Sequence, residues 1–282
     1  MRTHQQPRRA RIGLSVGAAV LALVAASVPA ADAVSPAQQH AKKAKPTVVL
    51  VHGAWADSSS WAGVVSLLQD DGYKVVVIAN PLHGLASDSA YLKGYLAAIP
   101  GPIVLVGHSY GGAVVTNAAT GNANVKALVY VDAFAPDQGE SVVQLASAKP
   151  GSALAADPTT VFSFAPFPGS LPGDVELTVL PTVFRKAFAN DLPRAEGKAL
   201  AATQRPVAGS ALQEPSAAPA WKTIPSWYLA GRIDGVLPIA EQKAMAHRAG
   251  SHLTKIKAGH LPMVSQPDAV EEIIVDAATA TD

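Results

Sequence analysis

Short runs of β-branched and other apolar residues recur along the chain from Thr47 onward, separated by stretches in which polar and small residues predominate. Runs of this length and composition predict buried β-strands. They lie at Thr47–Val51, Lys74–Ile78, Ile103–Val106, Val125–Val131, Ser226–Ala230 and Leu253–Ile256.

Longer stretches between these runs carry the spacing of amphipathic helices. The clearest are Trp61–Asp70, Gly111–Thr120, Ile239–Ala249 and Pro267–Ala278. Because strands alternate with stretches long enough to cross over a sheet, the pattern predicts an α/β fold with a mostly parallel sheet and helices on both faces. Residues 47–282 are expected to form this domain, since a chain of this length buries a large core.

One connection breaks the alternation. Residues from about 135 to 225 form a long insertion that is rich in Pro, Ala and Phe and is expected to be irregular. A long insertion on a regular scaffold is usually a functional lid. Its aromatic side chains Phe162, Phe164 and Phe167 are expected either to face a substrate, Phe164 above all, or to pack against the edge of the core.

The N-terminus has the pattern of a targeting segment. Arg8, Arg9 and Arg11 precede an uncharged run, and Ala31-Asp32-Ala33 offers small residues at a cleavage site. Residues 1–33 are therefore predicted to be a signal peptide for secretion, and residues 34–46 a polar linker. A retained membrane anchor is the alternative, because the uncharged run approaches the shortest length that spans a bilayer; we expect no stable membrane association after cleavage.

Composition narrows the possible chemistry. Of 282 residues, 49% are hydrophobic and none is cysteine, which excludes disulfides, a thiol nucleophile and thiolate metal sites. The formal net charge is +1, and no basic run with interleaved aromatics follows the leader. Nucleic acid is therefore not expected as a partner. No motif for a dinucleotide, a phosphate-binding loop or a metal ion stands out, so no cofactor is predicted.

The run Ile103–Val106 leads directly into Gly107-His-Ser-Tyr-Gly-Gly112, and a helical pattern of small residues follows. This is G-x-S-x-G between a strand and a helix, the arrangement that lifts a nucleophilic serine above a sheet on a sharp turn. Ser109 is the predicted nucleophile. The alternative is a tight turn that happens to contain serine.

A serine hydroxyl needs a base to remove its proton and an acid to orient that base. His260 follows the last predicted strand and precedes the final helix, and Asp234 follows the strand before it, which is the chain order serine, acid, histidine. His260 and Asp234 are therefore the predicted base and acid. Asp132, at the end of Val125–Val131, is the alternative acid, and His83 is the rival base, expected at the pocket rim.

An acyl-transfer intermediate also needs two backbone N–H groups aimed at its oxygen. The backbones of Ala54, after the first strand, and Tyr110, after the nucleophile, are predicted to supply them. His52 and His108 are interpreted as structural residues that brace these two turns. Trp55 and Phe134 are predicted to contact the substrate.

At these positions the sequence resembles the α/β-hydrolase family, and within it the small esterases akin to hydroxynitrile lyases and salicylate-type methylesterases. The resemblance rests on His52-Gly-Ala-Trp55, Gly107–Gly112, Tyr130-Val-Asp-Ala-Phe134 and Gly259-His-Leu-Pro-Met-Val-Ser-Gln-Pro267. Lyases of that group carry Thr where Gly53 stands and Lys where Leu261 stands. The resemblance therefore implies ester hydrolysis rather than cyanohydrin cleavage.

Together these observations predict a secreted serine hydrolase that cleaves carboxylic esters of small molecules with an apolar acyl or aryl group. Two alternatives remain open at this point. The same triad could carry out perhydrolysis, lactone opening or C–C cleavage, because fold does not fix chemistry. The chain could also be a ligand-binding protein with vestigial hydrolysis.

Overall fold

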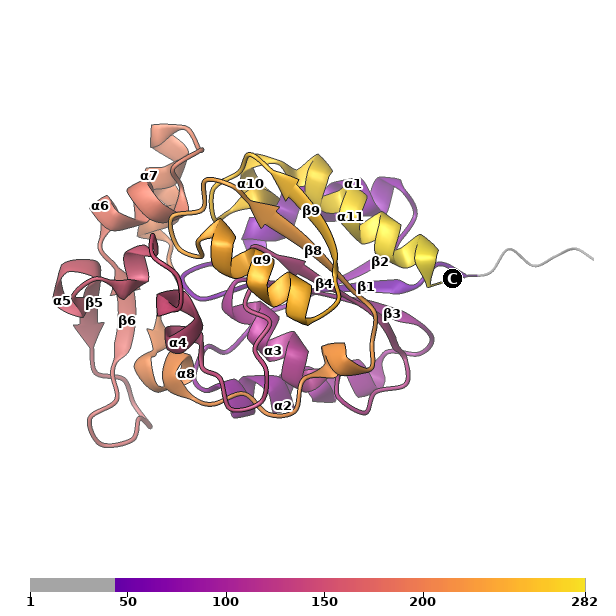
Figure 1. Ribbon diagram of the computed structural model, residues 1–282, viewed down its shortest axis with the longest axis horizontal. Coiled ribbons are helices and arrows are strands. Elements are labelled where there is room, and N and C mark those ends of the chain that lie inside the picture. The colour runs from indigo at the N-terminus through magenta and orange to yellow at the C-terminus, as the bar shows by residue number, and fades with distance from the viewer. Residues whose placement is uncertain (1–43, 282) are drawn as a thin grey trace, which may run out of the picture. The chain divides into compact units, whose positions relative to one another are not determined.

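A computed structural model describes residues 44–281 (Figure 1). The predicted signal peptide, residues 1–33, and most of the predicted linker lie outside the described residues, and residues 44–46 form no helix or strand. Within residues 44–281, no helix is both long enough and apolar enough to cross a membrane.

A six-stranded parallel sheet forms the centre of the described chain. Its strand order is β2-β1-β3-β4-β8-β9, and every neighbouring pair is parallel. The predicted strands agree with these elements to within two residues at either end, because runs of Val, Ile and Leu buried on both faces are the signature of parallel strands. The bounds are β1 Thr47–Val51, β2 Lys74–Ile78, β3 Ile103–His108, β4 Val125–Val131, β8 Ser226–Gly231 and β9 His252–Ile256.

Helices cover both faces of this sheet. Figure 1 shows α1, α10 and α11 on one side and α2, α3 and α9 on the other. Four of these helices were predicted; α2 and the short α10 were not. The bounds are α1 Ala62–Asp70, preceded by the 3₁₀ turn η1 Ser58–Trp61, and α2 Leu85–Ala98, α3 Tyr110–Ala118, α9 Ile239–Arg248, α10 Pro262–Ser265 and α11 Pro267–Ala280. The predicted fold class is confirmed.

The insertion of residues 135–225, called the cap from here on, is not irregular as predicted. It contains short helices and a three-stranded antiparallel sheet of order β5-β6-β7. Its strands are β5 Phe162–Ala165, β6 Glu176–Val179 and β7 Val207–Ala208. Its helical segments are α4 Val142–Ser147, η2 Ala153–Ala155, α5 Pro158–Val161, α6 Pro181–Val183, the π-helical η3 Phe184–Phe188, α7 Arg194–Ala202, α8 Gly209–Gln213 and η4 Ala220–Lys222.

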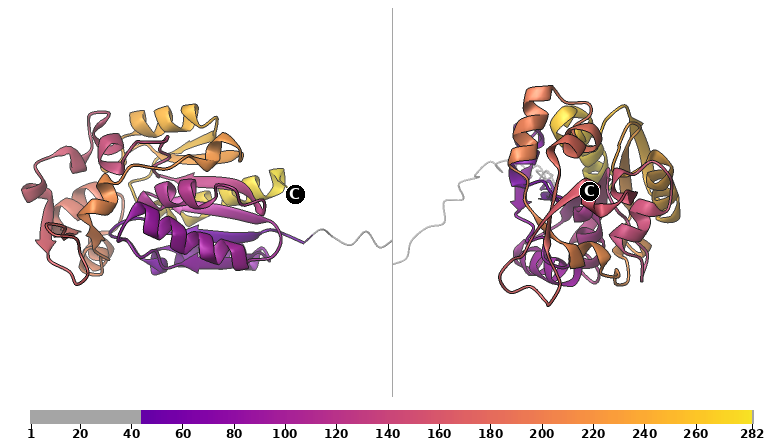
Figure 2. Two further views of the ribbon diagram at one scale, coloured as in Figure 1. Left: turned by 90° about the horizontal axis from the view of Figure 1, so that it is seen from below. Right: turned by 90° about the vertical axis from the view of Figure 1, so that its left-hand side faces the viewer.

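The cap follows the carboxyl end of β4 and lies beyond that end of the sheet, and the chain then runs to the amino end of the neighbouring strand β8 (Figures 1 and 2). Polar contacts join the N-terminal end of the cap to the body and its two ends to each other. The guanidinium of Arg248 in α9 binds both carboxylate oxygens of Glu140 at 2.6 and 2.7 Å and donates to the carbonyl of Ala135 at 3.0 Å. The indole N–H of Trp221 donates to the carbonyl of Pro136 at 3.0 Å.

Glycines allow β3 and α3 to meet at the turn that carries Ser109. A Cβ on Gly107 would lie 2.7 Å from the carbonyl oxygen of Gly111 and 2.8 Å from Cα of Gly112, both backbone atoms that cannot move aside alone. Gly107→Ala is therefore expected to lower the free energy of unfolding by about 1–3 kcal/mol, measured by urea denaturation.

The matched control is Gly94→Ala. Gly94 is an exposed residue inside α2, and a Cβ there meets nothing within 4 Å. The same substitution should stabilise the protein by up to about 1 kcal/mol through helix propensity. Equal effects at the two positions would contradict the close approach at Gly107.

Candidate active site

Ser109 occupies a strained turn between β3 and α3. Its backbone has φ +51° and ψ −126°, a region that side chains other than glycine rarely adopt. The loop after β1 presses against this turn, since a Cβ on Gly53 would lie 2.6 Å from Cβ of Ser109. Strain of this kind persists only where the surrounding structure holds it and is typical of reactive positions.

Ser109, His260 and Asp234 form a continuous hydrogen-bonded chain. Oγ of Ser109 lies 2.9 Å from Nε2 of His260, and Nδ1 of His260 lies 2.8 Å from Oδ2 of Asp234. His260 lies beyond β9 and Asp234 beyond β8, so the carboxyl ends of three parallel strands converge here. Ser109 is only 2% exposed and His260 0%, so the chain of hydrogen bonds is shielded from water.

Other donors fix the carboxylate of Asp234 in place. Oδ1 accepts from the amides of Val236 at 2.7 Å and Leu237 at 2.9 Å, and Oδ2 accepts from the Gln242 side chain at 3.3 Å. An anionic Asp234 accepts a hydrogen bond from Nδ1–H of His260, which holds the proton on Nδ1. Nε2 is then unprotonated and can accept the hydroxyl proton of Ser109.

The two predicted oxyanion donors belong to the start of α3 and to the loop after β1. Tyr110 is the first residue of α3, where backbone N–H groups have no partner within the helix. Ala54 lies in the loop after β1, which packs closely on α3, since a Cβ on Gly111 would lie 2.6 Å from the carbonyl oxygen of Val51. Among the hydrogen bonds of residues 44–281, none uses the backbone N–H of Ala54 or Tyr110.

His52 and His108 brace the two turns. Nε2 of His52 accepts from the amide of Asn80 at 3.0 Å, and its Nδ1–H donates to the carbonyl of Gly53 at 2.9 Å. Nε2 of His108 donates to the backbone carbonyl of His260 at 2.8 Å. Burial lowers the pKa of His52 to about 4 and holds that of His108 well below its usual range, so both rings are neutral at neutral pH.

The lowered pKa of His52 makes stability depend on pH. An unfolded chain binds a proton on this histidine below about pH 6.5, whereas the folded protein does so only near pH 4. This histidine has no effect on the pH dependence of stability above about pH 6.5, and it destabilises the folded protein by an amount that grows to about 3 kcal/mol as the pH falls toward 4.

Urea denaturation of the wild type and of His52→Gln between pH 7.5 and 4.5 measures this dependence. The wild type should be more stable at pH 7.5, and its advantage should shrink steadily toward pH 4.5. An advantage that stays constant with pH would show that His52 does not titrate as its burial requires.

The alternative base, His83, and the alternative acid, Asp132, lie outside the hydrogen-bonded chain. The ring of His83 stacks on Phe167 at 5.4 Å, and its Nε2 lies 3.5 Å from a carboxylate oxygen of Glu176, in a half-exposed position. Asp132 is fully buried beside Asp234, and its Oδ1 accepts from the amide of Gly231 at 2.6 Å. Neither makes a described hydrogen bond to Ser109 or His260.

The three predicted substrate contacts differ in position. Trp55 is buried, and its indole N–H donates to the carbonyl of Leu177 at 2.8 Å. Phe134 is buried below the turn, and its amide donates to the carbonyl of Ser109 at 3.1 Å. Phe164 lies on β5 and is 47% exposed.

Aromatic rings connect the cap to His260. The Trp55 ring stacks on Phe162 at 5.4 Å and meets the edge of Phe188 at 5.4 Å. The Phe188 ring in turn lies edge-on to the imidazole of His260 at 5.2 Å. These three rings, called the aromatic wall from here on, form a continuous set of contacts between the cap and His260.

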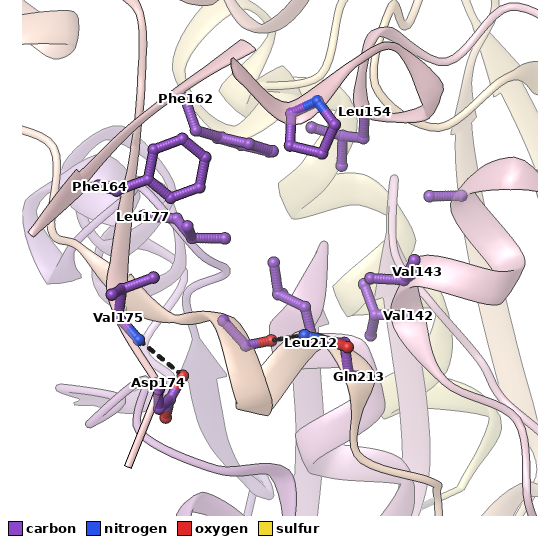
Figure 3. Close-up of a pocket in the computed structure, with 14 residues that line it drawn as sticks. Val142, Val143, Leu154, Phe162, Phe164, Asp174, Val175, Leu177, Leu212 and Gln213 are labelled. Carbon is purple, nitrogen blue, oxygen red and sulfur yellow. Dashed lines mark hydrogen bonds between the residues drawn. The ribbon is translucent and has the colours of Figure 1, made fainter. Parts of the chain in front are cut away.

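A cavity of about 380 Å³ lies in the cap, and Phe162 of the aromatic wall is one of its lining residues (Figure 3). Most of the side chains around it are apolar, and they project into the open space from several cap elements in Figure 3. The size and lining suit an apolar part of a small molecule. The cavity is lined by Val142, Val143, Ala146, Leu154, Pro158, Phe162, Phe164, Gly173, Asp174, Val175, Leu177, Gly209, Leu212 and Gln213.

Within residues 44–281, one group of three acidic or histidine side chains is close enough to hold a metal ion: Asp132, Asp234 and His260. The hydrogen bonds of His260 already use both of its ring nitrogens. A metal ion there would have to displace one of these bonds. The group is therefore better described as part of the hydrogen-bonded chain.

The sequence matches the family described as "Alpha/beta hydrolase family" over residues 48–273, most of the chain. The chain belongs to this family. The predictions of the fold and of the family are thereby confirmed, and the strand, turn and helix around Ser109 are features of an α/β-hydrolase.

Similar proteins include a carbendazim hydrolyzing esterase of Nocardioides sp. (strain SG-4G), 34% identical over 113 residues. That match covers 34% of this chain and 46% of the esterase, less than half of its length. A putative methylesterase 11 of Arabidopsis thaliana is 23% identical over 248 residues, 82% of this chain and 63% of that protein. The crystal structure of polyneuridine aldehyde esterase shares the fold, with a TM-score of 0.69 and 22% identity over 82% of this chain and 98% of that one.

Two features of this α/β-hydrolase site were not predicted from the sequence. Gln242 touches Asp234 from α9, yet a glutamine in an amphipathic helix is ordinarily exposed, so nothing in the sequence marks it. Phe188 contacts His260 from a π-helical segment of the cap. A π-helix inside an otherwise unpredicted region leaves no periodic signal, although such segments are frequent at functional sites.

Proposed function

We propose that this protein hydrolyses carboxylic esters through an acyl-enzyme intermediate on Ser109. The observation that carries the proposal is the buried hydrogen-bonded chain from Ser109 through His260 to Asp234. The names of similar proteins, among them an esterase and a methylesterase, support the predicted enzyme class, a carboxylic ester hydrolase.

In the first half of the reaction, Oγ of Ser109 attacks the ester carbonyl carbon while Nε2 of His260 takes the hydroxyl proton. The tetrahedral intermediate places its negative oxygen toward the backbone N–H groups of Ala54 and Tyr110. The imidazolium of His260 then gives its proton to the departing alkoxide, the C–O bond breaks, and an alcohol leaves. Asp234 stabilises the imidazolium during these steps.

In the second half, a water molecule replaces the alcohol. His260 accepts a proton from this water as it attacks the acyl carbon, and then returns the proton to Oγ of Ser109 as the carboxylic acid departs. Burial of the site strengthens each of these electrostatic interactions, because no bulk water screens them.

Covalent labelling tests the proposal directly. A fluorophosphonate should react with Oγ of Ser109 and expel fluoride, and mass spectrometry of a digest should find the adduct on the peptide that carries residue 109. Ser109→Ala should abolish labelling. A native protein that stays unlabelled, or is labelled at another serine, would refute a nucleophile at this position.

We also propose that the cap cavity receives an apolar acyl or aryl group of a small-molecule ester. Its apolar lining supports this, together with the half-exposed Val143 and Phe164 at its edge. Ser109 is buried and is not among the residues that line the cavity, so we propose that binding includes a movement that joins the cavity to the hydroxyl. No nucleic acid is part of this proposal.

Filling the cavity should change chain-length selectivity. Val143 is 45% exposed on α4 and lines the cavity, so Val143→Trp adds bulk without overfilling the core. We expect KM for p-nitrophenyl octanoate to rise by about tenfold, since a few buried methylenes are lost from the contact. KM for p-nitrophenyl acetate should change little.

Leu171→Trp is the matched control, because Leu171 is 73% exposed in the cap and does not line this cavity. It should leave both KM values close to those of the wild type. If Val143→Trp affected acetate and octanoate equally, the cavity would not be the binding site of the longer group.

Finally, we propose that the protein is secreted after removal of residues 1–33. The arginines, the uncharged run and Ala31-Asp32-Ala33 support this. Expression of the full chain in a secreting bacterial host, followed by N-terminal sequencing of the protein in the medium, should give a chain that begins at Val34. A cell-bound protein with an intact N-terminus would contradict the proposal.

A further inference from the structure

The site contains two neighbouring buried carboxyl groups, those of Asp132 and Asp234. Asp132 follows β4 directly, and Asp234 follows β8, the neighbouring strand. One oxygen of each carboxyl and one ring nitrogen of His260 lie within 4.8 Å of one another, and all three residues are buried. Two negative charges at this separation, away from water, repel strongly, so such a pair ordinarily holds one proton.

The hydrogen bonds show which carboxyl suits the negative charge. Asp234 accepts from four donors: two backbone amides, the Gln242 side chain and the His260 ring. Asp132 accepts from one, the amide of Gly231. Its Oδ2 is buried and has no partner among the described residues. A buried carboxylate oxygen without a donor is unfavourable, whereas a protonated one can itself donate.

We propose that Asp132 is a positioning residue that keeps its own proton, so that Asp234 carries the only negative charge beside His260. The proton lies on Oδ2 of Asp132 and points toward the carboxylate of Asp234. This inference rests on the proposed role of His260 as the base. It extends that role by naming the group that keeps the charge on Asp234.

The surroundings of Asp132 agree with a neutral carboxyl. Burial, and next the charge of Asp234, hold the pKa of Asp132 well above its usual range; Asp191 raises it further. The hydroxyl of Tyr228, another titratable group near Asp132, donates to the carbonyl of Ala133 instead. The hydrogen bond from the amide of Gly231 lowers the pKa of Asp132, but burial and the charge of Asp234 outweigh it.

Close packing holds the group in position. A Cβ on Gly231 would lie 2.4 Å from Oδ2 of Asp132, so glycine at 231 leaves room for the carboxyl. Asp132 has φ +42°, a conformation that Asp and Asn tolerate better than other side chains. Asp132→Asn therefore fits the backbone and keeps a neutral, planar group that can donate to Asp234.

Infrared spectroscopy of the resting protein, labelled with ¹³C at aspartate carboxyls, tests the protonation state without any assay of activity. At pH 8, exposed aspartates are ionised, and we expect one isotope-shifted band of a protonated carboxyl. The band should be absent in Asp132→Asn and present in the control Asp191→Asn. A wild-type spectrum without such a band would overturn the proposal, whether or not the protein hydrolyses esters.

The pH profile of kcat/KM gives a second, independent readout. If Asp132 is neutral, Asp132→Asn removes no charge, and the midpoint of the acidic limb should stay within about 0.3 pH units of the wild type. If Asp132 is ionised, removing its charge beside the imidazolium should lower that midpoint by about one unit or more. The second outcome would overturn the proposal while leaving the role of Ser109 intact.

Discussion

Ser109→Ala is expected to lower kcat/KM for p-nitrophenyl esters by about 10⁵-fold or more, because the substitution removes the attacking oxygen. The rest of the site should remain in place, since alanine keeps Cβ and the hydroxyl makes one described side-chain hydrogen bond, to His260. Any residual rate would come from positioning and from the oxyanion donors. Steady-state kinetics with highly purified protein measures the loss.

Ser265→Ala is the control for this substitution. Ser265 lies in α10, close in sequence to His260, and its buried hydroxyl has no partner among the described residues. The same chemical change there should leave kcat/KM near the wild-type value. If Ser109→Ala kept more than about 1% of the wild-type activity, hydrolysis would have to proceed without an acyl-serine.

Asp234→Asn is expected to lower kcat by about 10⁴-fold with little change in the fold. An asparagine amide can face Nδ1 of His260 with its N–H₂ group, which favours the tautomer that carries its proton on Nε2. That tautomer cannot accept the hydroxyl proton of Ser109. The loss of the negative charge also removes the stabilisation of the imidazolium.

Asp137→Asn is the control for Asp234→Asn. Asp137 forms a surface ion pair with Lys222 at 2.6 Å, away from His260, and exposed pairs of this kind contribute little. Its loss should leave kcat near the wild-type value. Burst kinetics should show that acylation is the step that Asp234→Asn slows. An effect of less than about tenfold would mean that another carboxyl orients His260.

The strands and the residues of the site could be predicted because their signals are local. Runs such as Val125–Val131 are buried on both faces and are continuous in sequence, and the turn at Ser109 has glycines where backbones touch. The chain order of parallel strands then indicated which histidine and which aspartate would meet the serine. The structure brings together Ser109, His260 and Asp234, as expected.

The helix α2 and the cap could not be predicted, for physical reasons. In α2, Gly94 lowers helix propensity, and Asp88 is buried in the same helix because it accepts from the hydroxyl of Tyr110 at 2.8 Å. Strand β5 pairs with β6 across a loop, and three of its four residues are exposed. Its stability depends on partners distant in sequence, which a periodicity does not reveal.

The choice between Asp132 and Asp234 shows a similar limit to prediction from the sequence. From sequence, Asp132 and Asp234 are both carboxyls at the ends of adjacent strands. Chain order favoured Asp234, but the donors around each carboxyl are visible only in the structure. Asp234 accepts from Val236, Leu237 and Gln242, which are 2, 3 and 8 residues away, whereas Asp132 accepts from Gly231, 99 residues away. Charge in a buried pair is decided by this surrounding hydrogen bonding rather than by residue type.

The attachment of the cap to two adjacent strands has a consequence for how selectivity can diverge. Residues 135–225 follow the carboxyl end of β4 and lead to the amino end of β8, so the segment connects two adjacent strands of one sheet. We therefore expect insertions, deletions or exchange within this segment to leave the register of the six strands unchanged. Ligand preference can therefore change through replacement of one contiguous segment, while Ser109, Asp234 and His260 lie outside the replaced residues.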